Sequence, residues 1–393
     1  MKERVILHCD LNNFFASVSL LSNVTLKDLP VAVCGSREKR HGIVLAKNEV
    51  AKKFGVKTAE AIWEAQAKCP DLIILPPDYQ KYKEYSQKAH KIYERYTDLI
   101  EPFGIDECWL DVTGSTLLFG NGEEIANKIR NDIKNELKIT ASVGVSFNKI
   151  FAKLGSDMKK PDATTVISKE NFREKIWRLP ASDLLFVGRH TADKLRQNGV
   201  LTIGDITVCD DKMLERLLGK NGADLKRYAL GLDNSPVTPP ADDEIPKSIG
   251  KSTTPDHDLK DREQVWKILL ELSDAVASSM REKGMKATTV TLHTRDTTLK
   301  VKETSKTVTV PVGSALTLAK VGMDIFDQTY NWALPLRSVG IRVSNLKGEE
   351  CAFQQDFFGE NVADQKTEII ESSIDKVRHK FGKEFITRGS TME

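Results

Sequence analysis

The sequence has no long apolar run and no closely spaced cysteines, and each absence excludes a class of protein. No stretch of its 393 residues approaches the roughly 18 apolar residues that span a bilayer, so no membrane span is expected. The six cysteines are scattered, without a Cys-x-x-Cys pair or a histidine at zinc spacing, which favours unpaired thiols in a reducing compartment. Charged residues interrupt the N-terminus too early for a signal peptide, so the cytoplasm is the expected location.

The net charge of +2 is too small to argue for a nucleic-acid partner, but the charge is unevenly distributed. Residues 245–348 hold sixteen Lys and Arg against eleven Asp and Glu, whereas residues 349–393 hold six against ten. A basic module followed by an acidic tail is typical of a phosphate-contacting domain with a separate partner-binding end, although solvated surfaces often have the same composition.

The pattern of apolar residues predicts a multidomain α+β fold, because 393 residues are too many for one core. Strands are expected at 4–9, 30–34, 43–46, 104–112 and 140–145, and helices at 11–21, 48–54, 79–99, 123–137 and 148–158. A glycine-punctuated helical region at 179–232 precedes four prolines in thirteen residues, which mark a linker. A second α+β module follows, with a helix at 264–281 and strands at 287–293, 307–312 and 338–346.

Carboxylates occur within two of the apolar strands. Asp10 is expected to end the first strand, and Asp106 and Glu107 lie near the start of the 104–112 strand. Acidic residues in apolar strands are unfavourable unless compensated, and Mg²⁺ prefers oxygen ligands that it shares with substrate phosphates. From spacing alone, a metal site and a pair of solvated strand ends remain equally open.

The residues around these carboxylates form three ordered motifs. They are Asp10-Leu-Asn-Asn-Phe-Phe-Ala-Ser-Val, Gly104-Ile-Asp-Glu-Cys-Trp-Leu-Asp-Val and Thr140-Ala-Ser-Val-Gly-Val-Ser-Phe-Asn-Lys-Ile-Phe-Ala-Lys-Leu-Gly-Ser-Asp-Met-Lys-Lys-Pro-Asp. With these motifs the chain resembles the Y family of translesion DNA polymerases, most closely its bacterial polymerase IV group. The resemblance covers nearly the whole chain.

The resemblance implies a right-hand polymerase that binds primer-template DNA and deoxynucleoside triphosphates, extends primers past damaged bases with low fidelity, lacks proofreading and acts as a monomer. It also implies a division of the chain into a palm, small fingers, a helix-hairpin-helix thumb, a linker, a little finger and a tail. These would be residues 1–28 with 78–167, 29–77, 168–234, 235–246, 247–348 and 349–393, respectively.

The resemblance assigns catalysis to Asp10, Asp106 and Glu107 with two Mg²⁺ ions. Asp10 and Asp106 would ligate both ions, Glu107 the catalytic one, and the Leu11 carbonyl the nucleotide-bound one. One ion would help to deprotonate the primer 3′-hydroxyl, and the other would steady the triphosphate and the leaving pyrophosphate. Asp111 is interpreted as a structural strand-end residue, because Mg²⁺ usually takes only one or two carboxylates beside water and phosphate.

Two adjacent aromatic residues follow Asp10. Phe15 falls where the family keeps its steric gate, an aromatic ring that leaves no room for a ribose 2′-hydroxyl. Phe14 is expected to pack beside the sugar or the base. The alternative is that both rings are core residues of the first helix.

The expected triphosphate contacts are Lys52 and Lys160. Lys160 matches the palm lysine of the family. Lys52 replaces the usual Arg of the fingers and loses its bidentate geometry, and Glu49 replaces the usual Tyr. Glu49 is expected to turn away from the triphosphate, because its charge would repel phosphate.

DNA contacts are expected from the thumb and the little finger. Phe186-Val-Gly-Arg-His resembles a helix-hairpin-helix turn in which only Gly188 remains of the usual Gly-x-Gly, and such turns hold phosphate through backbone N–H groups. Pro246-Lys-Ser-Ile-Gly-Lys-Ser-Thr-Thr resembles the start of the little finger and offers Lys251 to phosphate.

A short motif in the tail resembles the peptide that binds the bacterial sliding clamp. It comprises Gln354, Asp356, Phe357 and Phe358, with a loose aromatic turn as the alternative. Three other functions stay open for the whole chain: a mutagenesis subunit that requires accessory proteins, a non-catalytic clamp-binding scaffold, and a palm-fold nucleotide cyclase. The intact acidic triad argues against the scaffold, and a cyclase has no use for DNA-holding domains.

Overall fold

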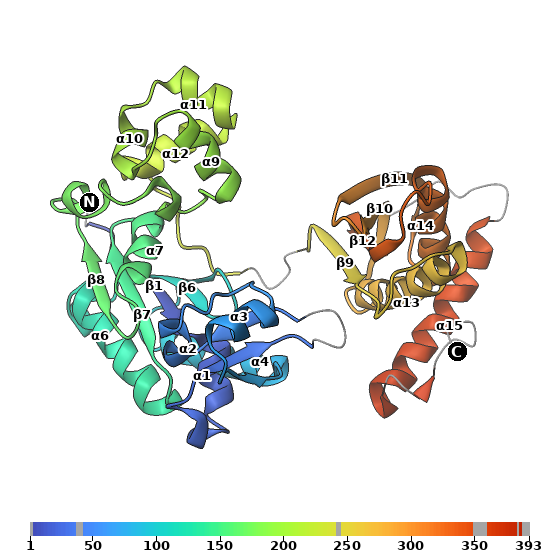
Figure 1. The fold of residues 1–393 in the computed structure, drawn as a ribbon, viewed down its shortest axis with the longest axis horizontal. Coiled ribbons are helices and arrows are strands. Elements are labelled where there is room, and N and C mark those ends of the chain that lie inside the picture. Colours follow the sequence, from blue (N-terminus) through green and yellow to red (C-terminus); the bar gives the residue numbers. More distant parts are fainter. Residues whose placement is uncertain (1–2, 37–41, 241–244, 349–359, 383–384, 387–393) are drawn as a thin grey trace. The chain divides into compact units, whose positions relative to one another are not determined.

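The computed structural model describes residues 3–36, 42–240, 245–348, 360–382 and 385–386 (Figure 1). The described residues form two compact units that divide near residue 242. The α+β class expected from the sequence is confirmed in both. Among the described residues, no helix is long and apolar enough to cross a membrane.

The first unit is built on a five-stranded sheet in the order β5-β6-β1-β7-β8. Its strands are β1 (Ile6–Leu11), β5 (Ile100–Pro102), β6 (Glu107–Asp111), β7 (Ala141–Ser146) and β8 (Thr164–Ile167). Strand β1 pairs antiparallel with both β6 and β7 and is buried along its whole length. β1 is therefore the middle strand of the sheet, with a paired strand on each side.

Different helices cover the two faces of this sheet. Leu7, Cys9 and Leu110 share one core with α1, α4 and α6, whereas α7 packs on the opposite face, where the absence of a side chain at Gly144 lets it approach closely. The helices are α1 (Phe14–Leu20), α4 (Tyr79–Tyr93), α5 (Thr116–Phe119), α6 (Gly122–Asp132) and α7 (Lys149–Met158), with a π-helix at Ile133–Leu137 and a 3₁₀ helix at Val24–Leu26.

A small sheet in the order β3-β2-β4 lies between α1 and α4 in the sequence. It consists of β2 (Val31–Cys34), β3 (Val44–Lys47) and β4 (Ile73–Leu75), with α2 (Glu49–Lys53) and α3 (Ile62–Lys68). Asn48 caps α2 by accepting a hydrogen bond from the Ala51 N–H, and it also bonds to the backbone of Leu29 and Val31. This buried asparagine fixes the start of α2 against β2.

Short helices follow β8 in the first unit, and they share an apolar cluster with α7 and the end of β8. They are α8 (Phe172–Ile176), α9 (Arg189–Gln197), α10 (Ile203–Val208), α11 (Asp211–Leu218) and α12 (Asn221–Ala229), with a 3₁₀ helix at Ala181–Asp183.

The second unit is a four-stranded antiparallel sheet in the order β11-β10-β12-β9, with α13 and α14 sharing an apolar core with one face. Its elements are β9 (Ser248–Thr253), α13 (Arg262–Arg281), β10 (Met285–Asp296), β11 (Val301–Val312), α14 (Ala315–Thr329), β12 (Leu336–Gly348) and α15 (Glu360–Phe381).

Ion pairs hold the last helix, α15, in the second unit. Arg281 of α13 contacts both Glu371 and Asp375, at 2.7 Å each. Lys286 pairs with Glu368 at 2.7 Å, and Arg378 pairs with Asp274. Charged contacts therefore contribute to this packing.

The structure corrects several expected boundaries. β1 runs through Asp10 to Leu11, and α1 starts only at Phe14 because Asn13 adopts a left-handed backbone conformation at its N-cap. The strand expected at 104–112 begins at Glu107, so Asp106 lies in the preceding turn. The sequence did not predict β9, α14 or α15. The boundaries proposed for palm, fingers, thumb and little finger stay predictions.

Candidate active site

Two of the predicted catalytic carboxylates are direct neighbours across the central sheet. In the antiparallel register of β1 and β6, Asp10 lies opposite Glu107. The Leu11 N–H donates to the Asp106 carbonyl at 3.0 Å, which holds Asp106 at the same end of the ladder. Strand pairing therefore brings Asp10, Leu11, Asp106 and Glu107 together, although they are about a hundred residues apart in sequence.

Two lysines supply positive charge to this cluster. Lys160 Nζ lies 2.7 Å from Asp10 Oδ2, and Lys153 Nζ lies 3.3 Å from the same oxygen and 3.0 Å from Glu107 Oε1. Both ammonium groups also pair with Asp157, which lies four residues after Lys153 and three residues before Lys160. Lys160 was predicted from the sequence, whereas Lys153 was missed, although the Ala-Lys element of that motif contains it.

Burial and neighbouring charge shift the pKa values of the three carboxyl groups. Burial raises the pKa of Asp10 to about 6 despite the nearby Lys160 and Lys153. Burial and the charge of Glu107 raise the pKa of Asp106. Burial acts in the same direction on Glu107, but His8 and Lys153 outweigh it and hold the pKa of Glu107 below its ordinary value. The cluster thus holds more negative charge than its surroundings readily accommodate.

A buried histidine lies beneath Glu107. His8 is fully buried, its Nδ1 lies 2.9 Å from Ser156 Oγ, and its Nε2 lies 3.5 Å from Glu107 Oε2 without a hydrogen-bond partner. Burial lowers the pKa of His8 to about 4. A neutral imidazole therefore forms part of the wall behind Glu107, and the sequence reasoning did not identify it.

Asp111 lies at the other end of β6, opposite Ile6. Its Oδ1 accepts hydrogen bonds from the N–H and the hydroxyl of Thr113, at 3.0 and 2.6 Å. These contacts agree with the interpretation of Asp111 as a structural residue.

The two aromatic residues after Asp10 occupy different environments. Phe14 is buried in the core shared with α4. Phe15 is partly exposed, its ring stacks on that of Tyr82 with centroids 4.2 Å apart and planes 9° apart, and Tyr79 meets it edge-on. The Phe15 ring is therefore held in one orientation by α4, a contact that the sequence did not predict.

The Glu49 side chain points toward α1. Glu49 Oε1 accepts a hydrogen bond from Asn13 Nδ2 at 2.9 Å and lies 3.5 Å from Lys52 Nζ. Asn13 therefore holds the Glu49 carboxylate on the α1 side, and the expectation that Glu49 turns away from the triphosphate stays a prediction.

The predicted DNA contacts lie at a helix start and on a sheet. Gly188 is the N-cap of α9, and Phe186 before it is exposed and has a left-handed backbone conformation with φ 72°. Lys251 lies on β9 in the second unit, far along the sequence from Gly188.

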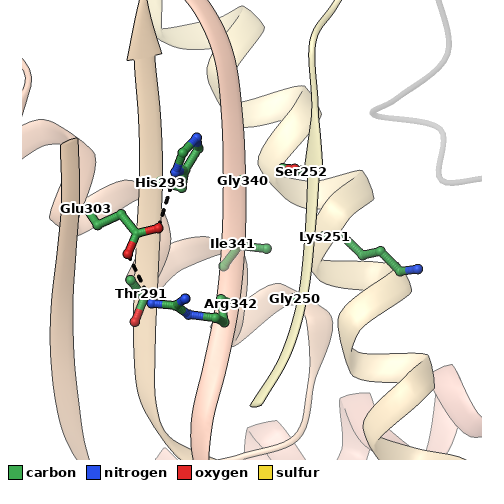
Figure 2. A pocket seen from close by; sticks show the side chains of 9 residues that line it. All are labelled: Gly250, Lys251, Ser252, Thr291, His293, Glu303, Gly340, Ile341 and Arg342. Atoms are coloured by element: carbon green, nitrogen blue, oxygen red, sulfur yellow. Dashed lines mark hydrogen bonds and ion pairs between the residues drawn. The ribbon is translucent and has the colours of Figure 1, made fainter. Parts of the chain in front are cut away.

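Lys251 borders a hollow of about 300 Å³ on the four-stranded sheet (Figure 2). Glu303 lies between two basic residues there: Arg342 Nη2 donates to it at 3.1 Å, and His293 Nδ1 lies 3.3 Å away. Gly250 and Gly340 lie on adjacent strands, and a Cβ at either position would crowd a residue of the neighbouring strand, Arg342 or Ser252. The lining consists of Gly250, Lys251, Ser252, Thr291, His293, Glu303, Gly340, Ile341 and Arg342.

The predicted clamp-binding residues, Gln354, Asp356, Phe357 and Phe358, lie outside the described residues. Within the described part of the chain, no group of three or more His, Cys, Asp or Glu side chains is arranged to hold a metal ion. Lysine ammonium groups instead balance Asp10 and Glu107.

Comparisons with known proteins match both parts of the chain. Residues 9–157 match the impB/mucB/samB family, and residues 246–357 match the C-terminal domain of the same family. DNA polymerase IV of Acetivibrio thermocellus is 48% identical over 392 residues, covering 100% of this chain and 98% of that protein. DNA polymerase IV 1 of Bacillus subtilis is 35% identical over 393 residues, covering 100% and 94%. A solved Y-family DNA polymerase chimera, Dbh-Dpo4(243-245)-Dbh, has a TM-score of 0.78 at 25% identity, covering 88% of this chain and 99% of that one.

Proposed function

Because the chain belongs to the impB/mucB/samB family and is a Y-family DNA-directed DNA polymerase of the polymerase IV type, we propose that Asp10, Asp106 and Glu107 form its nucleotidyl-transfer centre. The observation that carries the proposal is the cross-strand pairing of Asp10 with Glu107 at the end of the central ladder. The proposed reaction extends primers past damaged template bases with low fidelity and without proofreading.

The donor set fits divalent magnesium. Asp10 is buried, its pKa is raised to about 6, and its oxygens are balanced only partly by ammonium groups, so further positive charge would be favourable there. Carboxylate and carbonyl oxygens are the ligands that Mg²⁺ prefers, and Asp10, Asp106, Glu107 and the Leu11 carbonyl would supply them. Two bound Mg²⁺ ions would assist deprotonation of the primer 3′-hydroxyl and neutralise charge on the triphosphate.

Lys160 is proposed to leave its carboxylate partner and contact phosphate when a nucleotide binds. Lys160 now contacts Asp10 and is about a third exposed, so its ammonium group can turn to the triphosphate of an incoming nucleotide. Lys153 is more deeply buried and lies between Asp10 and Glu107, where it orients both carboxylates. Lys52 would add a second phosphate contact from the α2 side.

Phe15 is proposed to select the sugar. Its ring is fixed by stacking on Tyr82, so it cannot swing aside without losing that contact. A fixed ring beneath the sugar excludes a 2′-hydroxyl by overlap. Phe14 is buried in the core shared with α4, so its side chain has little surface to offer a nucleotide.

DNA would be held mainly through its phosphates. The N-terminus of α9 at Gly188 offers backbone N–H groups, and Lys251 and Arg342 offer charge beside the hollow on the four-stranded sheet. The chain is proposed to act as a monomer that a sliding clamp recruits through Gln354, Asp356, Phe357 and Phe358.

Primer extension by the purified chain tests the proposal. Undamaged templates and templates with defined lesions are compared with and without Mg²⁺. Metal-dependent extension of both by the chain alone supports the proposal. Extension that requires added proteins would favour a partner-dependent mutagenesis subunit. A complete absence of primer extension under all conditions would favour a scaffold.

A further inference from the structure

A side-chain hydrogen bond joins α2 to the start of α1. Asn13 Nδ2 donates to Glu49 Oε1 at 2.9 Å across 36 residues of sequence. Asn13 lies between Asp10 and Phe15, with a left-handed backbone conformation at φ 47°. The Glu49 carboxylate is therefore held beside the chain segment that carries the proposed metal ligand and sugar gate.

The backbone on both sides of this bond is anchored. Asn12 donates to Ser142 Oγ at 2.9 Å and accepts from the Asp162 N–H at 2.8 Å, which fixes the segment before α1. Asn48 is buried and bonds to Leu29, Val31 and Ala51, which fixes the first residue of α2. Around the Asn13–Glu49 hydrogen bond, the side chains can therefore rearrange while the backbone stays in place.

The Lys52 side chain is more exposed than that of Glu49 and so has more freedom to rearrange. Its ammonium group lies 3.5 Å from Glu49 Oε1, one helical turn away, and the side chains of Lys52 and Glu49 are 49% and 38% exposed. Such exposed pairs contribute little free energy, so a more highly charged anion can take the lysine from the carboxylate. A nucleoside triphosphate is an anion of this kind.

We propose that Glu49 sets the affinity of the polymerase for incoming nucleoside triphosphate by competing with phosphate for Lys52. The inference rests on the proposed function, in which Lys52 contacts the triphosphate. When phosphate takes Lys52, Glu49 keeps its hydrogen bond from Asn13 and stays near the site as an uncompensated negative charge. The carboxylate then weakens nucleotide binding without contacting the reacting atoms, so Glu49 acts on KM rather than on kcat.

Substitutions that change one charge at a time test this competition. Glu49→Gln removes the charge but keeps an oxygen that accepts from Asn13, and Lys52→Ala removes the proposed phosphate contact. Both are made singly and together. Glu84→Gln is the matched control, because Glu84 of α4 also pairs with a lysine of its own helix, Lys88, at 2.7 Å.

Two readouts separate binding from chemistry. KM and kcat are measured for single-nucleotide incorporation, and equilibrium nucleotide affinity is measured on the enzyme bound to a dideoxy-terminated primer. Glu49→Gln should lower both KM and Kd at least threefold and leave kcat within twofold of wild type. Lys52→Ala should raise KM by a larger factor in the Glu49→Gln background than in wild type, because the lysine is then no longer shared. Glu84→Gln should change none of these values.

The outcomes distinguish this inference from the proposed function. If wild type polymerises but Glu49→Gln leaves KM and Kd unchanged, the competition is overturned while the polymerase assignment stands. Equal effects of Lys52→Ala in both backgrounds would also overturn it, because Glu49 and Lys52 would then act independently. A wild-type chain without any polymerase activity would overturn both.

Discussion

Asp10 and Glu107 face each other across β1 and β6, and one ammonium group, that of Lys153, lies within 3.3 Å of both carboxylates. Cross-strand neighbours have Cβ atoms only about 5 Å apart, so two ionised carboxylates at this spacing repel each other unless a cation separates them. The site thus requires positive charge, which lysines supply in part in this structure and which divalent ions would supply further during nucleotidyl transfer.

Replacement of Asp106 or Glu107 by Ala should abolish nucleotide incorporation and leave DNA affinity nearly unchanged. Metal-dependent chemistry relies on a few carboxylates, whereas DNA binding is spread over many phosphate contacts. Single-turnover incorporation and fluorescence anisotropy with labelled primer-template measure the two effects. Asp111→Asn is the control and should stay active, because Asp111 lies at the far end of β6. More than a few per cent of wild-type turnover in Asp106→Ala would contradict the assignment.

Replacement of Phe15 by Ala should admit ribonucleotides. The exclusion is steric, and loss of the ring opens the space that the 2′-hydroxyl needs. Insertion of dCTP and CTP opposite a template guanine is compared for the wild type, Phe15→Ala and Phe15→Tyr. The tyrosine variant keeps a ring that can stack on Tyr82 and should keep the wild-type sugar preference. An unchanged preference in the alanine variant would mean that Phe15 is only a packing residue.

DNA affinity should fall steeply with salt and vary little with sequence, because phosphate contacts release counterions. Lys251→Ala should weaken binding on all sequences and reduce the slope of log K against log salt by about one. Glu303→Gln should act in the opposite direction and tighten binding, because it frees Arg342 and removes a negative charge from the hollow. A salt titration of both variants on two unrelated sequences measures this. Weaker binding by Glu303→Gln would show that this face does not contact phosphate.

His8 should make the folded protein less stable in acid. Burial lowers its pKa from 6.5 to about 4, so between these values the unfolded chain binds a proton that the folded chain does not. Stability contributed through His8 is therefore present above about pH 6.5 and is lost, by about 3 kcal/mol, as the pH falls to about 4. The pKa of Asp10, raised to about 6, has the opposite effect, because the folded chain then binds the extra proton.

A variant isolates the His8 contribution. Thermal unfolding of the wild type and His8→Asn without metal is followed across this pH range. As the pH falls, the melting temperature of the wild type should decrease more than that of the variant, because only the wild type loses the histidine contribution. A difference that stays constant with pH would contradict the buried, neutral state of His8.

Combined replacement of Phe357 and Phe358 by Ala should abolish stimulation by a sliding clamp. Truncation of buried aromatic anchors typically costs about 2 kcal/mol or more, which weakens binding by more than roughly tenfold. Clamp-free extension of a short primer is the control and should be unchanged, because the motif lies outside the catalytic motifs in the sequence. Primer length is followed while clamp is titrated. Full stimulation of the variant would assign recruitment to another surface.

The sequence predicted the residue types of the site but not their contacts. Asp10 and Glu107 were recognisable as carboxylates in apolar strands, whereas their register depends on long-range pairing that no local pattern encodes. Helical periodicity extended across residues 11–21, but hydrogen bonds around Asn12 and the left-handed Asn13 delay the helix. Tyr82 looked like any apolar position of an amphipathic helix, so its stacking on Phe15 was not predictable.

The ion pairs that attach α15 give the C-terminal part of the chain a distinctive response to temperature. Arg281, Lys286 and Arg378 make charged contacts at this joint. The cost of removing charged groups from water falls as temperature rises, whereas stabilisation by apolar burial levels off. Warming therefore weakens this attachment less than an apolar contact of similar size. Because these side chains are largely buried, salt screens their ion pairs less than it screens exposed pairs. The second unit thus combines a helix attached by heat-tolerant, largely buried ion pairs with a sheet core held by apolar packing.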